Sequence, residues 1–157
     1  MEKLLLILIL LIIFIQDLKM RAVYWFLFPI LLGGSIWYNI QNIDLLSLSW
    51  NLGFITVSLG LLTVYVSLRQ RKLTAIWNGF FSIGDILFLI AIIPLLPFHT
   101  YLIYFTIGTI CSLLFHAIEM LFFRDNKTVP FAGYMALVLI GFLAFDTSIN
   151  LLIQNTF

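Results

Sequence analysis

Two aspartates stand at the ends of apolar stretches in this 157-residue chain, where they could carry out acid–base chemistry. Asp17 follows the first apolar stretch, and Asp85 opens a later one. Two carboxylates that share a site can activate water, because their repulsion keeps one ionised and the other protonated. This chemistry is that of an aspartyl protease. Simpler interpretations are an interfacial anchor for Asp17, beside Lys19 and Arg21, and a helix N-cap for Asp85.

The composition predicts a membrane protein. Hydrophobic residues make up 63% of the chain and charged residues 10%, and the mean hydropathy is +1.15, whereas soluble domains carry about a quarter charged residues. The length allows one domain, residues 1–157, with about six spans of roughly 20 residues. A net charge of +1 gives no indication of a nucleic-acid partner. The single Cys111 lies in an apolar run and is expected to be a small core residue, not part of a disulfide or metal site.

Six apolar helices are expected to position the aspartates, which predicts an all-α bundle. The expected ranges are 1–16, 22–38, 50–68, 85–96, 101–123 and 131–153. Glycines and Ser82 predict a break within 73–84, so the fourth helix should be short, beginning near Asp85 and ending at Pro94 and Pro97. The first helix would be about 24 Å long, shorter than the roughly 30 Å hydrocarbon core. Asp17 should therefore lie at or just within the membrane boundary.

The basic residues predict the topology. Three clusters follow the first, third and fifth helices: Lys19 with Arg21; Arg69 with Arg71 and Lys72; and Arg124 with Lys127. Because basic loops stay cytoplasmic, both termini should be outside, and Asp17 and Asp85 should meet at the cytoplasmic face. Lys3 is an exception to this pattern, and the negative charge of Glu2 offsets its positive charge. The cationic residues follow the first apolar run and no cleavage signature is present, so a transmembrane helix is expected there instead of a signal peptide.

Three segments carry a family resemblance. They are Asp17-Leu18-Lys19-Met20-Arg21, Ser82-Ile83-Gly84-Asp85 and Lys127-Thr128-Val129-Pro130-Phe131-Ala132. Together and in this order they resemble the type IV prepilin peptidase and preflagellin peptidase family of membrane aspartyl proteases. In that family a first aspartate opens a D-x-K-x-R-like stretch, the second lies in a GxGD motif, and a K-x-I-P-F-x-P/A segment precedes the last helices. The resemblance implies six helices and a catalytic pair, Asp17 and Asp85.

The resemblance also implies a reaction. It implies an endopeptidase of a prokaryotic inner membrane that removes the basic leader of a pilin-like precursor, using water as the nucleophile and no metal or organic cofactor. Gly84 would let the substrate backbone approach closely, while Lys19 and Arg21 would anchor the topology or modulate the carboxylates. Ser82 stands where the family has glycine, and serine disfavours a strongly positive φ. Paired CxxC motifs are absent from the sequence, so N-methylation of the product is not expected.

Other polar residues give alternative interpretations. The chain could be a non-catalytic membrane protein, either a degenerate homologue that acts as an assembly partner or a proton-coupled transporter using Asp17, Asp85 and Asp146. Transporters often show inverted repeats, and none is apparent. Asp146 is expected in the outer half of the last helix, hydrogen-bonded to its neighbours.

Two further sets of residues are given structural roles. His116 and Glu119 stand three residues apart and could offer two metal ligands, but no third ligand has a matching position. A polar pair near Arg124, at the end of the fifth helix, is therefore preferred to a metal site. Six glycines are expected to permit close helix packing: Gly33, Gly34, Gly53, Gly60, Gly133 and Gly141.

Overall fold

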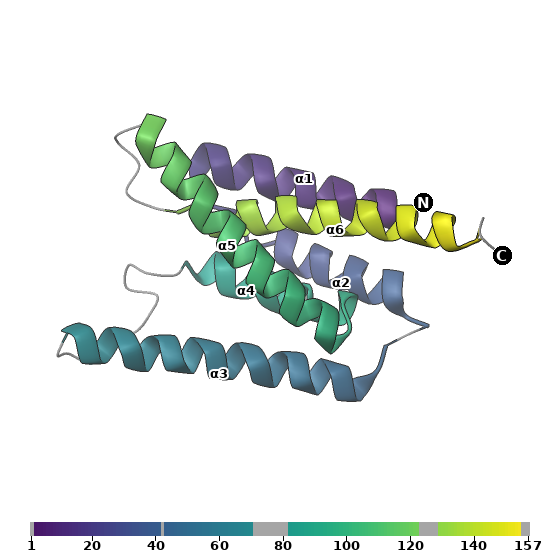
Figure 1. Ribbon diagram of the computed structural model, residues 1–157, viewed down its shortest axis with the longest axis horizontal. Helices are drawn as coiled ribbons and strands as arrows, with labels where there is room; N and C mark the ends of the chain where they lie inside the picture. The colour runs from purple at the N-terminus through teal and green to yellow at the C-terminus, as the bar shows by residue number, and fades with distance from the viewer. Residues whose placement is uncertain (1, 42, 71–81, 123–128, 155–157) are drawn as a thin grey trace.

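The computed structural model describes residues 2–41, 43–70, 82–122 and 129–154, and in this part of the chain helices are the only regular secondary structure. The elements are α1 (Glu2–Met20), α2 (Leu27–Asn39), α3 (Leu45–Gln70), α4 (Ile83–Ala91), the 3₁₀ helix η1 (Ile93–Leu95), α5 (Phe98–Phe122) and α6 (Phe131–Gln154). The predicted all-α class is confirmed. Successive helices alternate in direction, so the ends of α1, α3 and α5 lie at the same end of the molecule as the beginnings of α4 and α6 (Figure 1).

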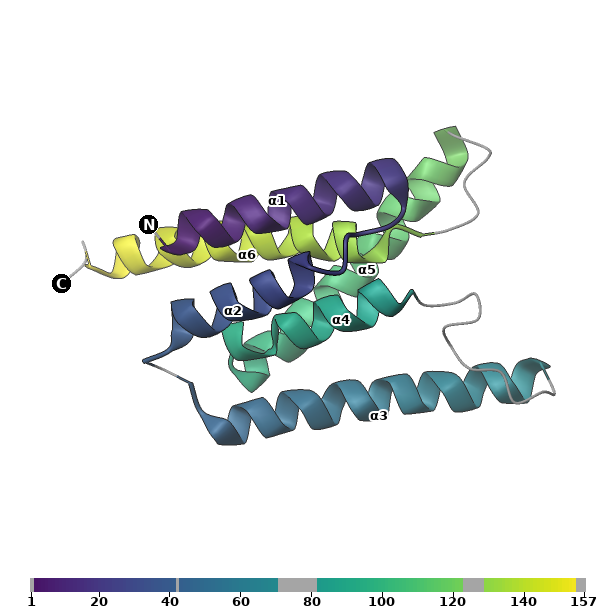
Figure 2. The ribbon, with the colours of Figure 1, turned by 180° about the vertical axis from the view of Figure 1, so that it is seen from behind.

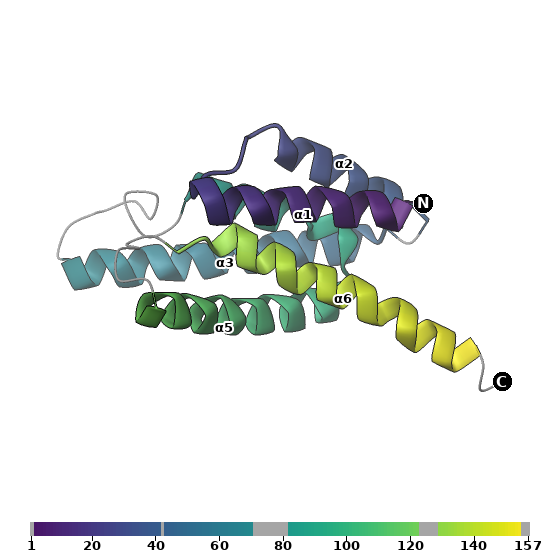
Figure 3. The same cartoon turned by 90° about the horizontal axis from the view of Figure 1, so that it is seen from above.

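The helices pack in an order that leaves α3 at the edge. α1 and α6 lie side by side and antiparallel and form the most extensive helix pair, and α5 packs on α6 (Figures 2 and 3). α2 and α4 lie between the α1–α6 pair and α3 (Figure 2), and α3 contacts α5 and η1. Fully buried side chains from α1, α2, α4, α5 and α6 form the core, among them Ile13, Leu31, Phe88, Tyr104 and Met135.

Among the described residues, two helices are long and apolar enough to cross a membrane. They are Leu45–Leu68 and Phe98–Leu121, with 24 residues each. Two further apolar helices, Ile83–Leu95 and Phe131–Ala144, are shorter. Length and composition therefore indicate two candidate spans in this part of the chain, and a bundle of six spans remains a prediction.

The junction between α1 and α2 differs from the prediction. α1 continues to Met20, so Asp17 lies in its last turn, and the helix is about 28 Å long at 1.5 Å per residue. Arg21 ends the helix because it takes a left-handed conformation, with φ of 49°, and its N–H donates to the Asp17 carbonyl oxygen at 2.9 Å. The second helix is present, but its predicted start at residue 22 was five residues too early, since α2 begins at Leu27.

Two helix starts follow from side-chain caps. α3 begins at Leu45, five residues earlier than predicted, because Asp44 accepts from the Leu46 and Ser47 amides at 3.1 Å each. These bonds hold the pKa of Asp44 below its usual value. α4 is short, as predicted, and begins directly after its cap, Ser82. The predicted break within 73–84 lies mostly outside the described residues, as do the basic residues at 71, 72, 124 and 127.

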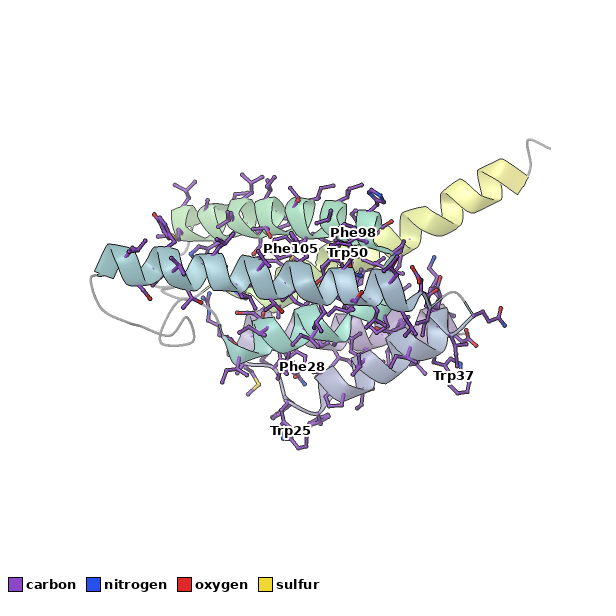
Figure 4. The ribbon with its side chains drawn as sticks, turned by 90° about the horizontal axis from the view of Figure 1, so that it is seen from below. Trp25, Phe28, Trp37, Trp50, Phe98 and Phe105 are labelled. Atoms are coloured by element: carbon purple, nitrogen blue, oxygen red, sulfur yellow. The ribbon has the colours of Figure 1, made fainter. Side chains whose placement is uncertain are left out.

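Aromatic and amide side chains attach α3 to the other helices. Trp50 lies against Phe98, with ring centroids 6.0 Å apart (Figure 4). One turn further along α3, Phe54 packs edge-on against Phe105 of α5, with centroids 5.2 Å apart. Asn51 is fully buried and donates to the carbonyl oxygens of η1 and the residue that follows it, at 3.3 and 3.0 Å. By contrast, Trp25 and Trp37 are 74% and 66% exposed (Figure 4), and the Trp37 indole N–H donates to Glu2 Oε1 on α1 at 3.1 Å.

Candidate active site

The structure brings Asp17 and Asp85 together at the beginning of α6. The Gly133 N–H donates to Asp17 Oδ2 at 2.6 Å, and the Ala132 N–H donates to Asp85 Oδ1 at 3.0 Å. Because consecutive backbone nitrogens are at most about 4 Å apart, the two oxygens lie within about 10 Å of each other. Both aspartates are buried, with 6% and 7% of their surface exposed, and the carboxylates are close enough for their charges to repel.

The first turn of α6 explains why both carboxylates gather there. The first hydrogen bond of this helix runs from Tyr134 N to Pro130 O at 3.2 Å, which makes Pro130 the N-cap residue. Proline has no side-chain acceptor, so it leaves the amides of the first turn without a cap. Asp85 and Asp17 supply the missing acceptors from α4 and α1. The helix dipole also favours negative charge at this end, so α6 stabilises two buried carboxylates side by side.

Asp85 is fixed through its second oxygen as well. The Ser82 N–H donates to Asp85 Oδ2 at 2.9 Å, while Ser82 Oγ accepts from Gly84 N at 3.0 Å. These reciprocal bonds form a capping box at the start of α4. Ser82 has φ of −75° and ψ of 147°, a conformation open to any residue. Serine therefore fits this position without strain, and its hydroxyl helps to orient the carboxylate.

The capping box predicts the effect of replacing Ser82 with glycine or alanine. Ser82→Gly should destabilise the protein by only a few tenths of a kcal/mol, and Ser82→Ala by about 1 kcal/mol, because glycine is a tolerated cap and alanine is not. In both variants the backbone N–H of residue 82 can still bind Asp85, so the carboxylate should keep its orientation. Thermal melting of both variants tests this. A Ser82→Ala variant as stable as the wild-type protein would mean that the hydroxyl does not act as the cap of α4.

Two glycines allow the close approach of helices at the aspartates. A Cβ atom on Gly133 would lie 3.0 Å from Asp17 Cβ and 3.2 Å from its Oδ2. A Cβ atom on Gly84 would lie 3.1 Å from Ser82 Oγ and 3.4 Å from the Phe28 ring. The sequence suggested helix packing for Gly133 but did not connect it to the site. Gly84 has packing partners in its own chain, and its predicted contact with a substrate backbone remains a prediction.

The packing role predicted for the other glycines is only partly correct. A Cβ atom on Gly34 would lie 3.0 Å from Leu6, so this glycine does permit close packing. For four glycines it would meet no atom of the described structure, and the prediction was wrong for them: Gly33, Gly53, Gly60 and Gly141. Gly108, which the prediction omitted, faces Met135 closely.

The cationic residues of the first motif separate into two roles. Lys19 is exposed, whereas Arg21 donates to Glu119 Oε1 on α5 at 2.6 Å. Glu119 Oε2 accepts from the Tyr134 hydroxyl at 3.1 Å and lies 3.8 Å from His116 Nδ1. From the sequence this glutamate was expected beside Arg124, which is outside the described residues, and its partners Arg21, directly after α1, and Tyr134 on α6 were not predicted. No group of three or more His, Cys, Asp or Glu side chains within the described part could hold a metal ion.

The remaining candidates lie away from the aspartates. Asp146 belongs to α6, but its side chain is outside the described set. A cavity of about 620 Å³ opens at the other end of the molecule, where α2 ends and α3 and α5 begin. Asn39, Asp44 and Pro94 help to line it, and neither aspartate of the pair does.

The geometry of the pair permits one kind of chemistry in particular. Two carboxylates from different helices are buried side by side and held by backbone donors, an arrangement that can take a proton from water and donate one to a carbonyl oxygen. The chain matches no protein-family model, and comparison with curated proteins and with solved structures found no similar protein. The function must therefore be inferred from the residues and their geometry.

Proposed function

We propose that the protein is a membrane aspartyl endopeptidase that cleaves the leader peptide of type IV prepilin-like precursors at the cytoplasmic face of a prokaryotic inner membrane. The observation that supports this most is the binding of Asp17 and Asp85 to consecutive amides of α6. Two residues distant in sequence come together as a pair, and each belongs to a motif that resembles the peptidase family.

In the proposed reaction one carboxylate acts as the base and the other as the acid. The ionised carboxylate takes a proton from water, and the water oxygen attacks the scissile carbonyl carbon while the protonated carboxyl donates to the carbonyl oxygen. Hydrogen bonds from Ala132 and Gly133 favour the ionised form of whichever aspartate serves as base. A carboxylate has about four acceptor sites on its two oxygens, so the bonds from these amides leave sites on both aspartates for water and substrate.

The proposal includes a membrane arrangement of six spans with both termini outside. The alternating helix directions place the aspartates at the end where α1, α3 and α5 finish (Figure 1). The basic residues of the sequence follow these same helices. Under the positive-inside rule this end faces the cytoplasm, where a precursor still carrying its leader would be met.

Thiol labelling tests this topology. In a Cys111→Ala background, Gln41→Cys should react with an impermeant maleimide added outside intact cells, and Gln70→Cys should react only after permeabilisation. Gln41 is chosen because it is exposed and lies outside the Asp44 cap of α3. Labelling of position 70 and not of position 41 in intact cells would reverse the orientation and remove the basis for a cytoplasmic active site.

A non-catalytic membrane protein is the second candidate, and one observation favours it. Asp17 and Asp85 both cap α6, and Asp85 also completes a capping box, so each aspartate has a structural role without any reaction. Such a protein would act as an assembly partner and would leave a precursor intact.

Co-expression with a pilin-like precursor separates the two candidates. We expect a shorter product on a gel with the wild-type protein, and mass spectrometry should place its new N-terminus where the basic leader meets the apolar helix. An Asp17→Asn variant expressed at the same level is the control and should leave the precursor uncut. An intact precursor in the presence of well-expressed wild-type protein would favour the non-catalytic candidate.

A further inference from the structure

A polar cluster lies next to the aspartate pair and joins three helices. It consists of Arg21 after α1, Glu119 on α5 and Tyr134 on α6, joined by the 2.6 and 3.1 Å hydrogen bonds that Glu119 accepts. The side chains of the ion pair are 23% and 19% exposed. Because the pair is largely shielded from solvent, it is screened less than a surface ion pair.

Arg21 connects this cluster to Asp17 through the backbone. Its N–H donates to the carbonyl oxygen of Asp17, and its left-handed φ of 49° turns the chain away from α1 at this point. This conformation is unfavourable for arginine, so the side-chain bond to Glu119 helps to hold it. The end of α1, and with it Asp17, is thereby tied to α5.

Tyr134 connects the cluster to the other side of the same site. It follows Gly133, whose N–H binds the Asp17 carboxylate, and its own N–H makes the first hydrogen bond of α6. Its ring stacks on Phe115, with centroids 5.3 Å apart, so both the ring and the hydroxyl contact α5. The first turn of α6 is therefore held against the same helix that binds Arg21.

We propose that Glu119 is a positioning residue for the aspartate pair. It accepts hydrogen bonds from Arg21 and Tyr134 together, and so fixes the end of α1 against the first turn of α6. In this arrangement the Gly133 N–H can bind the Asp17 carboxylate. This inference rests on the proposed peptidase function. Glu119 acts through Arg21 and Tyr134 and does not itself take part in the chemistry.

The kinetic signature of such a role is a loss of turnover without a loss of substrate binding. Glu119→Ala should lower kcat by about 10- to 100-fold, because small displacements of catalytic groups cost rates of that order, while KM should change less than about twofold. Glu119→Gln should recover much of the loss, since its amide oxygen can accept from Arg21 and its amide N–H can donate to the Tyr134 hydroxyl. Glu2→Ala is the matched control, because Glu2 also bonds across helices, to Trp37, but at the opposite end of α1.

A second measurement reports on the register independently of cleavage. Spin labels at Met20→Cys and Val129→Cys, both exposed positions, flank the cluster on α1 and before α6. In a Cys111→Ala background in lipid nanodiscs, their dipolar coupling should be well defined with Glu119 present and should become weaker or broader in Glu119→Ala. Glu2→Ala should leave it unchanged.

The outcomes distinguish this inference from the proposed function. Weakened coupling together with a reduced kcat supports positioning by Glu119. Unchanged coupling in Glu119→Ala overturns it, and so does altered coupling with full turnover. If the wild-type protein does not cleave the precursor, the proposed function fails, and the coupling still decides whether Glu119 holds α1 against α6.

Discussion

An Asp17→Asn variant should lose at least about 1,000-fold in precursor cleavage while melting close to the wild-type temperature. The bond from Gly133 N needs one acceptor oxygen, which asparagine keeps, and asparagine is about as good a cap as aspartate. The substitution removes only the ability to ionise and to exchange a proton. Cleavage and thermal melting measured on one preparation therefore separate catalysis from capping.

Asp85→Asn should lose as much activity, and it should also lower the stability of the protein. Both carboxylate oxygens of Asp85 accept hydrogen bonds, from Ala132 and from Ser82, and an asparagine side chain has a single acceptor oxygen. We expect a destabilisation of about 1 kcal/mol from the lost bond. Stability equal to that of Asp17→Asn would contradict this account of the two sites.

Asp146→Asn is the control for the transporter alternative. Position 146 lies 13 residues beyond Gly133 on α6, about 20 Å along the helix at 1.5 Å per residue, so most of the cleavage activity should remain. A transporter would instead be damaged by the Asp146 substitution as well as by the other two.

A second large effect is expected at Gly133. A methyl group there would press on Asp17 Cβ and Oδ2, so Gly133→Ala should push α1 away from α6 and destabilise the protein by about 1–3 kcal/mol. Gly133→Val adds two further methyl groups at the same contact and should lower cleavage by about 100-fold or more, since the aspartate pair would be displaced. Kinetics and thermal melting of both variants are the measurements.

Gly141→Ala provides the matched comparison on the same helix. A Cβ atom there would meet no atom of the described structure, and alanine favours the helix, so stability and cleavage should stay at or above wild-type values. If Gly133→Ala and Gly141→Ala behave alike, the close contact between Gly133 and Asp17 is not important for the site.

The sequence contained enough information to pair the aspartates. Charge clusters and helix parity placed Asp17 and Asp85 at one end of the molecule, and prolines and glycines around Asp85 predicted a short fourth helix. These inferences worked because charge and helix-breaking residues act locally and leave visible patterns. They needed no knowledge of how helices pack.

The contacts that hold the pair could not be read from the sequence. Pro130 lies in a recognisable motif and leaves the first amides of α6 without a side-chain cap. Nothing local in the sequence shows that Asp17 and Asp85, 113 and 45 positions earlier in the chain, accept from these amides. The pairing of Arg21 with Glu119 spans 98 positions. It depends on the left-handed conformation of Arg21, which the sequence does not indicate because the residue is neither glycine nor asparagine. Tertiary packing determines both features.

A double-mutant cycle on Asp17 and Asp85 is the most direct test of the claim that they act as one catalytic pair. Cleavage rates are measured for the wild-type protein, Asp17→Asn, Asp85→Asn and the double variant, each checked for folding by thermal melting. Because the two groups share one function, the double variant should be hardly slower than either single variant. Cleavage above a few per cent of wild type in either single variant, or losses that multiply in the double variant, would contradict the proposal.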